Sequence, residues 1–169
     1  TDMLDLSRID AGLPLHAMDA ISQRSPTPRC STRPRSRGSP PPRPPVDGST
    51  RFQPTAAILD RLDVPLDGLI VASPSNPTGS MIGADEFRLL ADLCRSKSVR
   101  LISDEIYHGL TYGQTPVTAL QLDADAIIIN SFSKYFGMTG WRLGWCIVPD
   151  EMVDVLERLA QNFYICPPT

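Results

Sequence analysis

The strongest constraint on the fold is a set of four short apolar segments, each about as long as a β-strand. The segments lie at 68–74, 99–105, 125–130 and 142–148. Continuous apolar runs of this length, ended by turn-forming residues, are typical of strands that are buried on both faces of a sheet. None of them is long enough to span a bilayer. The chain is therefore expected to build a buried β-sheet.

Three other segments show the periodicity of helices and lie beside or between these strands. The segment at 54–62 begins with proline, which suits the first turn of a helix, and the segment at 150–163 opens with acids that suit the helix dipole. In the segment at 84–98 one face is apolar and comprises Phe87, Leu90, Ala91 and Cys94. Strands that alternate with helices predict an α/β fold, with a mostly parallel sheet and covering helices.

Residues 25–45 differ sharply in composition from the sequence that follows. They are mostly Pro, Arg and Ser, without any acid, Leu, Ile, Val or Phe. Such a segment cannot bury apolar surface, so we expect it to be disordered or polyproline-like, and to be cut first in limited proteolysis. Its P-x-x-P spacing suits a proline-recognising domain, and its arginines suit a nucleic-acid arm. We favour no selected function, since an out-of-frame stretch of a GC-rich gene tends to translate as Arg, Pro and Ser.

Charge and cysteine usage exclude several classes of function. The formal net charge of −3 does not suggest a nucleic-acid or anionic-membrane partner. The cysteines form no C-x-x-C pair and the two histidines lie far from any pair, so no metal site is expected. Cys94 and Cys146 lie within apolar patterns that predict buried free thiols. Reduced thiols and the lack of an apolar signal segment indicate the cytoplasm.

Polar and turn-forming residues follow three of the predicted strands. The sequence SPSNPTGS follows the first strand, Asp104 closes the second, and SFSK follows the third. Ligands of such sheets bind beyond the carboxyl ends of the strands. The side chains that we expect to gather there are Asn76, Asp104, Tyr107, Ser131, Ser133, Lys134 and Arg142.

These side chains together suggest one kind of ligand. Lys134 is one of only two lysines and stands at a strand end beside aromatic residues, where a primary amine can act as a nucleophile. A carboxylate at a neighbouring strand end, Asp104, needs a cation or an N–H partner. Hydroxyls and an arginine near the lysine can hold a phosphate. Pyridoxal 5'-phosphate, an aromatic aldehyde with a phosphate and a basic ring nitrogen, meets all of these requirements.

Three segments, SNPTG, SDEIY and SFSKYFGMTGWRLGW, resemble the signatures of the class I/II, fold-type I pyridoxal-phosphate aminotransferases, and they occur in the family's order. The resemblance implies an enzyme similar to aspartate aminotransferase, which transfers an amino group between an amino acid and a 2-oxo acid. It also implies a homodimer and the large-domain fold of that family.

The resemblance assigns a role to each candidate residue. Lys134 would bond covalently to the cofactor aldehyde, and Asp104, buried and ionised, would pair with the pyridine nitrogen. Tyr107 and Asn76 would bond the ring's phenolic oxygen. The phosphate would be held by Ser131, Ser133 and Arg142. The family also leads us to expect a cis peptide bond between Asn76 and Pro77.

Simpler interpretations of single residues stay open at this point. Asn76–Gly79 alone would suggest only a turn, and Tyr107 a core tyrosine. His108 is expected on the surface or in packing, and Trp141 and Trp145 in the core. Ser133 can merely bond its own backbone. SFSK also fits the S-x-x-K motif of serine hydrolases, with Ser131 as nucleophile and Lys134 as base, but the S-D-N and K-T-G partner motifs are absent.

The resemblance covers only part of such an enzyme. Residues 46–169 match part of a cofactor-binding large domain, and residues 1–24 weakly resemble the family's N-terminal segment. A long segment with the glycine-rich loop and the ring-stacking aromatic is expected between these parts, and residues 25–45 stand in its place. The family's C-terminal small domain, with the arginine for the substrate carboxylate, is expected after residue 169. A non-catalytic remnant, or a chain that associates with intact subunits, is therefore the alternative to an active aminotransferase.

Overall fold

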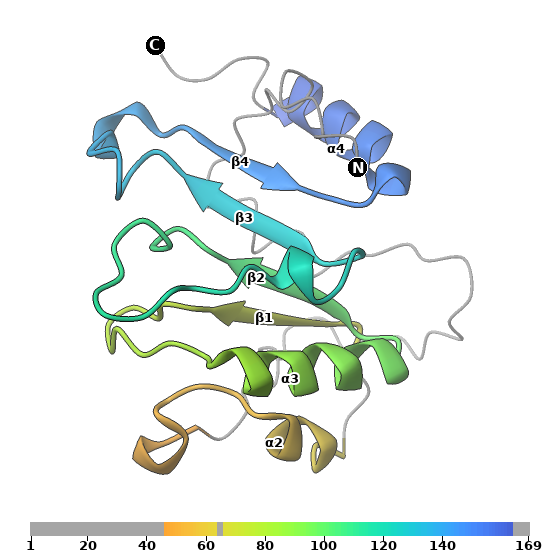
Figure 1. Ribbon diagram of the computed structural model, residues 1–169. Helices are drawn as coiled ribbons and strands as arrows, with labels where there is room; N and C mark the ends of the chain where they lie inside the picture. The colour runs from red at the N-terminus through yellow and green to blue at the C-terminus, as the bar shows by residue number, and fades with distance from the viewer. Residues whose placement is uncertain (1–45, 64–65, 164–169) are drawn as a thin grey trace.

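The computed structural model describes residues 46–63 and 66–163 (Figure 1). The regions that the sequence separates as 1–24 and 25–45 lie outside the described residues, so the expectations for them are not examined by the structure. Among the described residues no helix is both long and apolar enough to cross a membrane.

The four predicted strands form one sheet. They are β1 (Gly68–Ala72), β2 (Arg100–Asp104), β3 (Ile127–Ser131) and β4 (Gly144–Ile147), in the spatial order β1-β2-β3-β4. β1, β2 and β3 are parallel, and β4 is antiparallel to β3. The prediction of a mostly parallel sheet is confirmed. The connection from β3 to β4 contains only a short 3-10 turn, η5 (Thr139–Trp141), and no crossover helix, so the chain returns antiparallel.

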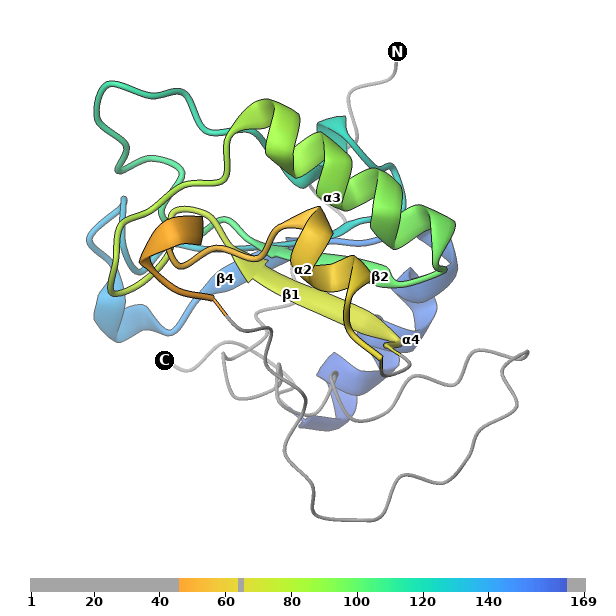
Figure 2. The same cartoon turned by 90° about the horizontal axis from the view of Figure 1, so that it is seen from below.

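Two helices lie on the same side of the sheet. α3 (Ala84–Ser96) packs on β2 and buries the four residues predicted from its periodicity: Phe87, Leu90, Ala91 and Cys94. The shorter α2 (Ala56–Asp60) packs on α3 and buries Leu59. Figure 2 shows these helices and α4 (Asp150–Phe163) on opposite sides of the sheet. Each face of the sheet therefore carries at least one helix.

The residues of the strands alternate between the two faces. Leu69, Val71, Leu101 and Ile128 belong to the core beneath α2 and α3. Buried residues outside that core include Ile102, Ile127 and Cys146. Ile70 of β1, by contrast, is 45% exposed and points to the face opposite that of Leu69 and Val71.

Two boundaries differ from the sequence prediction for local reasons. The helix predicted over 54–62 begins only at Ala56, because the side chain of Thr55 accepts a hydrogen bond from Ile58 N and caps the helix. The strand predicted from residue 142 begins at Gly144, because Arg142 has a left-handed backbone with φ of 53°. Thr55 and Arg142 therefore lie outside the helix and the strand that were predicted to include them.

The predicted burial of two cysteines is confirmed. Cys94 and Cys146 are buried free cysteines. Burial, reinforced by the negative charge of Asp123, raises the pKa of the Cys94 thiol to about 11. Burial also raises the pKa of Cys146. Both side chains therefore remain protonated thiols at neutral pH and pack as small apolar groups.

Candidate functional site

The carboxyl ends of β1, β2 and β3 meet at one edge of the sheet, because these three strands are adjacent and parallel. Asp104 ends β2 and is paired in register with Ala72 of β1 and Ile129 of β3. It therefore lies in the middle of the edge, with the loop after β1 on one side and the loop after β3 on the other. This is where α/β sheets bind ligands.

The loops after the three strands bring Asn76, Tyr107 and Lys134 together. The Asn76 side-chain amide donates to the Tyr107 hydroxyl at 3.3 Å. The Lys134 ammonium lies over the Tyr107 ring, with Nζ 5.9 Å from the ring centroid. The Asn76–Pro77 bond is cis, as expected from the sequence, and the Ser73–Pro74 bond is cis as well. Tyr107 is thus the side chain that connects the other two.

Asp104 is half-buried and holds one backbone hydrogen bond, from Ile106 N to Oδ1 at 3.1 Å. Burial raises the pKa of the Asp104 carboxyl, while the Ile106 hydrogen bond and the charge of His108 act in the opposite direction. The carboxyl group was expected to be ionised, and its burial opposes that state in the absence of a cation. A cationic group placed against it would offset the cost of burying the charge.

Ser131, Ser133 and Arg142 belong to a second hydrogen-bonded cluster in the loop after β3. The Ser131 hydroxyl donates to Ser133 Oγ at 2.8 Å and lies 3.1 Å from the carbonyl oxygen of Leu143. Thr139 Oγ1 donates to the Ser133 carbonyl at 2.7 Å, and Arg142 Nη1 donates to the Thr139 carbonyl at 3.2 Å. Thr139 therefore joins the arginine to the serines, a role that the sequence analysis did not assign.

The Ser131 hydroxyl is thus used within its own turn. Among the described residues no hydrogen bond joins Ser131 Oγ to Lys134 Nζ, which the S-x-x-K interpretation would require. Lys134 is exposed, and no carboxylate in the described ranges forms a salt bridge with it. Its amine is therefore accessible to a ligand from the sheet edge.

Aromatic side chains pack beside the lysine. The ring of Phe132 lies 5.1 Å from that of Phe136 and 4.9 Å from that of Trp145, measured between centroids. The expectation that Trp141 belongs to the core is wrong: its side chain lies in η5 and is 63% exposed. Trp145 is half-buried, because it belongs to a paired strand. Trp141 lies in a 3-10 turn outside the sheet, where the described residues leave its side chain exposed.

A buried carboxylate and a histidine support the same strand end. Glu105 is 3% exposed; its Oε1 accepts from Ala119 N at 2.9 Å, and its Oε2 lies 3.3 Å from His108 Nδ1. His108 Nε2 lies 3.0 Å from the carbonyl oxygen of Ser73, the first residue after β1. The ring therefore bridges the ends of β1 and β2. The i, i+3 spacing of Glu105 and His108 was a signal in the sequence that could have suggested this pair.

Comparison with known proteins identifies the same family that the motifs resemble. The sequence model of the family "Aminotransferase class I and II" matches residues 41–169. A relative named valine–pyruvate aminotransferase, from Mycobacterium tuberculosis, is 52% identical over 126 residues, which is 73% of this chain and 32% of the relative.

Solved structures agree with this result. The crystal structure of an aminotransferase from Mycobacterium tuberculosis superposes with a TM-score of 0.70 at 52% identity, over 73% of this chain and 33% of that one. Aspartate aminotransferase from Thermus thermophilus, in a double-mutant form, gives a TM-score of 0.69 at 28% identity, over 72% and 32% of the two chains. The chain therefore spans about a third of the length of the relatives it matches.

Proposed function

The chain belongs to the class I and II aminotransferases, and we propose that it carries the cofactor site of an enzyme that transfers an amino group between an amino acid and a 2-oxo acid. The proposed cofactor is pyridoxal 5'-phosphate. One observation carries the proposal: an accessible primary amine, Lys134, lies over Tyr107, which is hydrogen-bonded to Asn76, at the sheet edge that Asp104 occupies.

The described side chains fit this cofactor. Asp104 is a half-buried carboxylate whose burial raises its pKa, and it therefore gains from a cationic partner such as a protonated pyridine nitrogen. The Tyr107 hydroxyl and the Asn76 amide are donors that suit the ring's phenolic oxygen. Lys134 supplies the amine that an aldehyde requires. Each of the three kinds of group on the ring thus has a matching side chain.

The phosphate would be held by the loop after β3. Ser131 and Ser133 offer two hydroxyls, and Arg142 offers a guanidinium that stays charged at every physiological pH. Hydrogen bonds between the two serines, and from Arg142 to a carbonyl of the same loop, hold these side chains in place. When a phosphate is bound, the two hydroxyls would donate to its oxygens and no longer to one another, since charge-assisted hydrogen bonds are the stronger ones.

When bound, pyridoxal phosphate supplies an aldehyde for amines and an aromatic ring that withdraws electrons from the bonds at the substrate α-carbon. Lys134 is the residue of the set whose primary amine can bond to an aldehyde and can also carry a proton. Its Nζ can accept the proton from the substrate α-carbon and return it, whereas an arginine guanidinium remains protonated and is no nucleophile. Asp104 would supply the negative charge for a protonated ring nitrogen and would thereby favour electron withdrawal by the ring.

Substrates, assembly and location follow from the family and remain part of the proposal. The relative from Mycobacterium tuberculosis is named for valine and pyruvate, which makes this the first substrate pair to test. We propose a homodimer in the cytoplasm that acts in amino-acid metabolism, with residues 46–169 as part of the cofactor-binding domain. The buried thiols Cys94 and Cys146 are consistent with a reducing compartment.

The experiment is covalent labelling of the lysine. The chain is incubated with pyridoxal phosphate, reduced with borohydride, digested, and analysed by mass spectrometry. We expect the label on Lys134. Lys97 is the internal control, because it lies at the exposed end of α3 and its Nζ is held 2.8 Å from Asp60 Oδ1. Label mainly on Lys97 would overturn the assignment.

A non-catalytic chain that keeps part of the pocket is the second candidate. The observation in its favour is that the match covers about a third of the relatives' length. Labelling of Lys134 without turnover of valine and pyruvate by this chain would support this candidate. Turnover that is lost in the Lys134→Ala variant would support the enzyme.

A further inference from the structure

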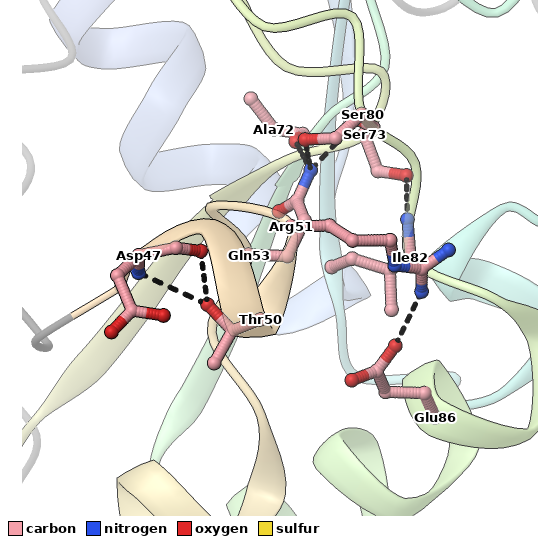
Figure 3. Close-up of polar contacts among 9 residues, drawn as sticks. All are labelled: Asp47, Thr50, Arg51, Gln53, Ala72, Ser73, Ser80, Ile82 and Glu86. Carbon is pink, nitrogen blue, oxygen red and sulfur yellow. Dashed lines mark hydrogen bonds and ion pairs between the residues drawn. The ribbon is translucent and has the colours of Figure 1, made fainter.

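A buried glutamine crosses from the segment before α2 to the loop that carries Asn76. Gln53 is 2% exposed, and its Nε2 donates to the carbonyl oxygens of Ala72 at 3.0 Å and Ser80 at 2.8 Å (Figure 3). The Ser80 hydroxyl lies 3.4 Å from the same nitrogen. Both N–H groups of the amide are therefore satisfied by backbone of one loop.

The two carbonyls lie at the two ends of the loop. Ala72 is the last residue of β1, and Ser80 is where the chain returns after the turn. Ser75 N also donates to the Ser80 carbonyl, at 2.9 Å. Gln53 thus closes the base of a loop whose middle contains Asn76, the residue that contacts Tyr107.

No strand of the described sheet can make the bond to Ala72. β1 is the edge strand of that sheet. Ser73 N donates inward to the Asp104 carbonyl at 3.3 Å, and the carbonyl of the same peptide group, that of Ala72, therefore points away from β2. A carbonyl of this kind that is buried without a donor is costly. The Gln53 side chain supplies the donor from outside the sheet.

The backbone before Gln53 is strained, and burial of the Phe52 side chain does not account for the strain. Arg51 and Phe52 have φ of 54° and 59°, values that residues with side chains rarely adopt, and Phe52 is 52% exposed. Such strain persists only where the surroundings over-determine it. The turn η3 (Gly48–Thr50), capped by Asp47, and the Arg51–Glu86 ion pair at 3.0 Å hold this segment (Figure 3).

We propose that Gln53 is a positioning residue for Asn76: its amide fixes the base of the loop at 73–80 and thereby sets the contact of Asn76 with Tyr107. The inference rests on the proposed function, in which Asn76 and Tyr107 donate to the cofactor ring. Gln53 touches neither the cofactor nor a reacting atom. It acts only through the loop.

The test replaces Gln53 by a side chain of the same shape that cannot donate when it is ionised. In Gln53→Glu the ionised carboxylate would face the carbonyls of Ala72 and Ser80, whereas the protonated acid regains one donor. The contact is read in the cofactor-free 169-residue chain by NMR, as the nuclear Overhauser effect between the Asn76 side-chain amide and the Tyr107 ring. We expect this signal to be lost at pH 8 and to return as the pH falls toward 5.

A matched control removes the neighbouring ion pair only. Glu86→Gln removes the charge that pairs with Arg51 and should leave the Asn76–Tyr107 signal unchanged at both pH values. The second variant is Gln53→Met, which has no donor at any pH and should lack the signal throughout. A signal that persists in Gln53→Met, or that is lost equally in Glu86→Gln, would overturn the proposal. So would global unfolding of both Gln53 variants, since the role would then be that of a core residue.

Cofactor binding supplies the second readout. Loss of one or two neutral hydrogen bonds at the base of the loop should weaken cofactor binding. We expect the dissociation constant for pyridoxal phosphate to rise by about three- to tenfold in Gln53→Glu at pH 8. If the unmodified chain binds no cofactor, the proposed function fails, and the Overhauser signal still decides the role of Gln53. If cofactor binds equally well to both chains although the signal is lost, the link from Gln53 to the site is wrong.

Discussion

Adding a single methyl group at Gly109 should disturb the loop that contains the lysine. A Cβ built on Gly109 would lie 2.3 Å from Cδ2 and 2.4 Å from Cγ of Tyr135, the residue directly after Lys134. Carbon atoms in contact are separated by about 3.5–4.0 Å, so the ring must retreat by about 1.2 Å or more. Because Tyr135 is 58% exposed, its ring can swing toward solvent. We expect Gly109→Ala to cost about 1–2 kcal/mol, at the lower end of the range for overpacking.

Urea unfolding measures this cost. With a slope of about 2 kcal/mol per M, the expected loss lowers the midpoint by roughly 0.5–1 M. The matched control is Gly140→Ala in the loop between β3 and β4, which also contains Lys134. There an added Cβ meets nothing within 4 Å. That variant should remain within about 0.5 kcal/mol of the unmodified chain.

A double-mutant cycle identifies the collision as the cause. In a Tyr135→Ala background the ring is absent, so the cost of Gly109→Ala should fall nearly to zero and the coupling should equal about 1–2 kcal/mol. An unchanged midpoint for Gly109→Ala alone would refute the reasoning. So would an equal loss with and without the tyrosine ring, which would trace the effect to the Gly109 backbone.

Two further predictions concern the carboxyl groups of Asp104 and Glu105. Burial raises the pKa of Asp104 above its ordinary value of 3.8, so its contribution to stability is present below that value and is lost as the pH rises through the raised pKa. Without cofactor, Asp104→Asn should therefore gain stability relative to the unmodified chain between pH 4 and pH 7, as urea unfolding at both pH values would show; a constant difference would contradict this. Glu105→Ala should cost about 2–4 kcal/mol, because it leaves the buried Ala119 N–H without its acceptor and opens a cavity, whereas Glu105→Gln keeps an acceptor and should cost about 1 kcal/mol. Equal losses in the two Glu105 variants would show that the Ala119 hydrogen bond is not the cause.

Much of the fold could be predicted because its signals are local. The spacing of Phe87, Leu90, Ala91 and Cys94 specifies which face of α3 is buried, whatever the helix packs against. The strand-length apolar runs likewise predict β1, β2 and β3, together with the edge at which their carboxyl ends meet. The exact ends of α2 and β4 were not predicted. They depend on local geometry at one residue each, the side-chain cap of Thr55 and the left-handed backbone of Arg142.

The sequence by itself determined the α/β class, the sheet edge at which the chemistry is expected, and the candidate residues there, because these depend on periodicity and on short motifs. Only the tertiary structure decided how those residues are supported. Gln53 meets Ala72 and Ser80 across 19 and 27 residues, and His108 meets Ser73 across 35. No pattern along the chain encodes these contacts, because each depends on how separate segments pack, and the same packing left Trp141 exposed where an aromatic residue suggested core.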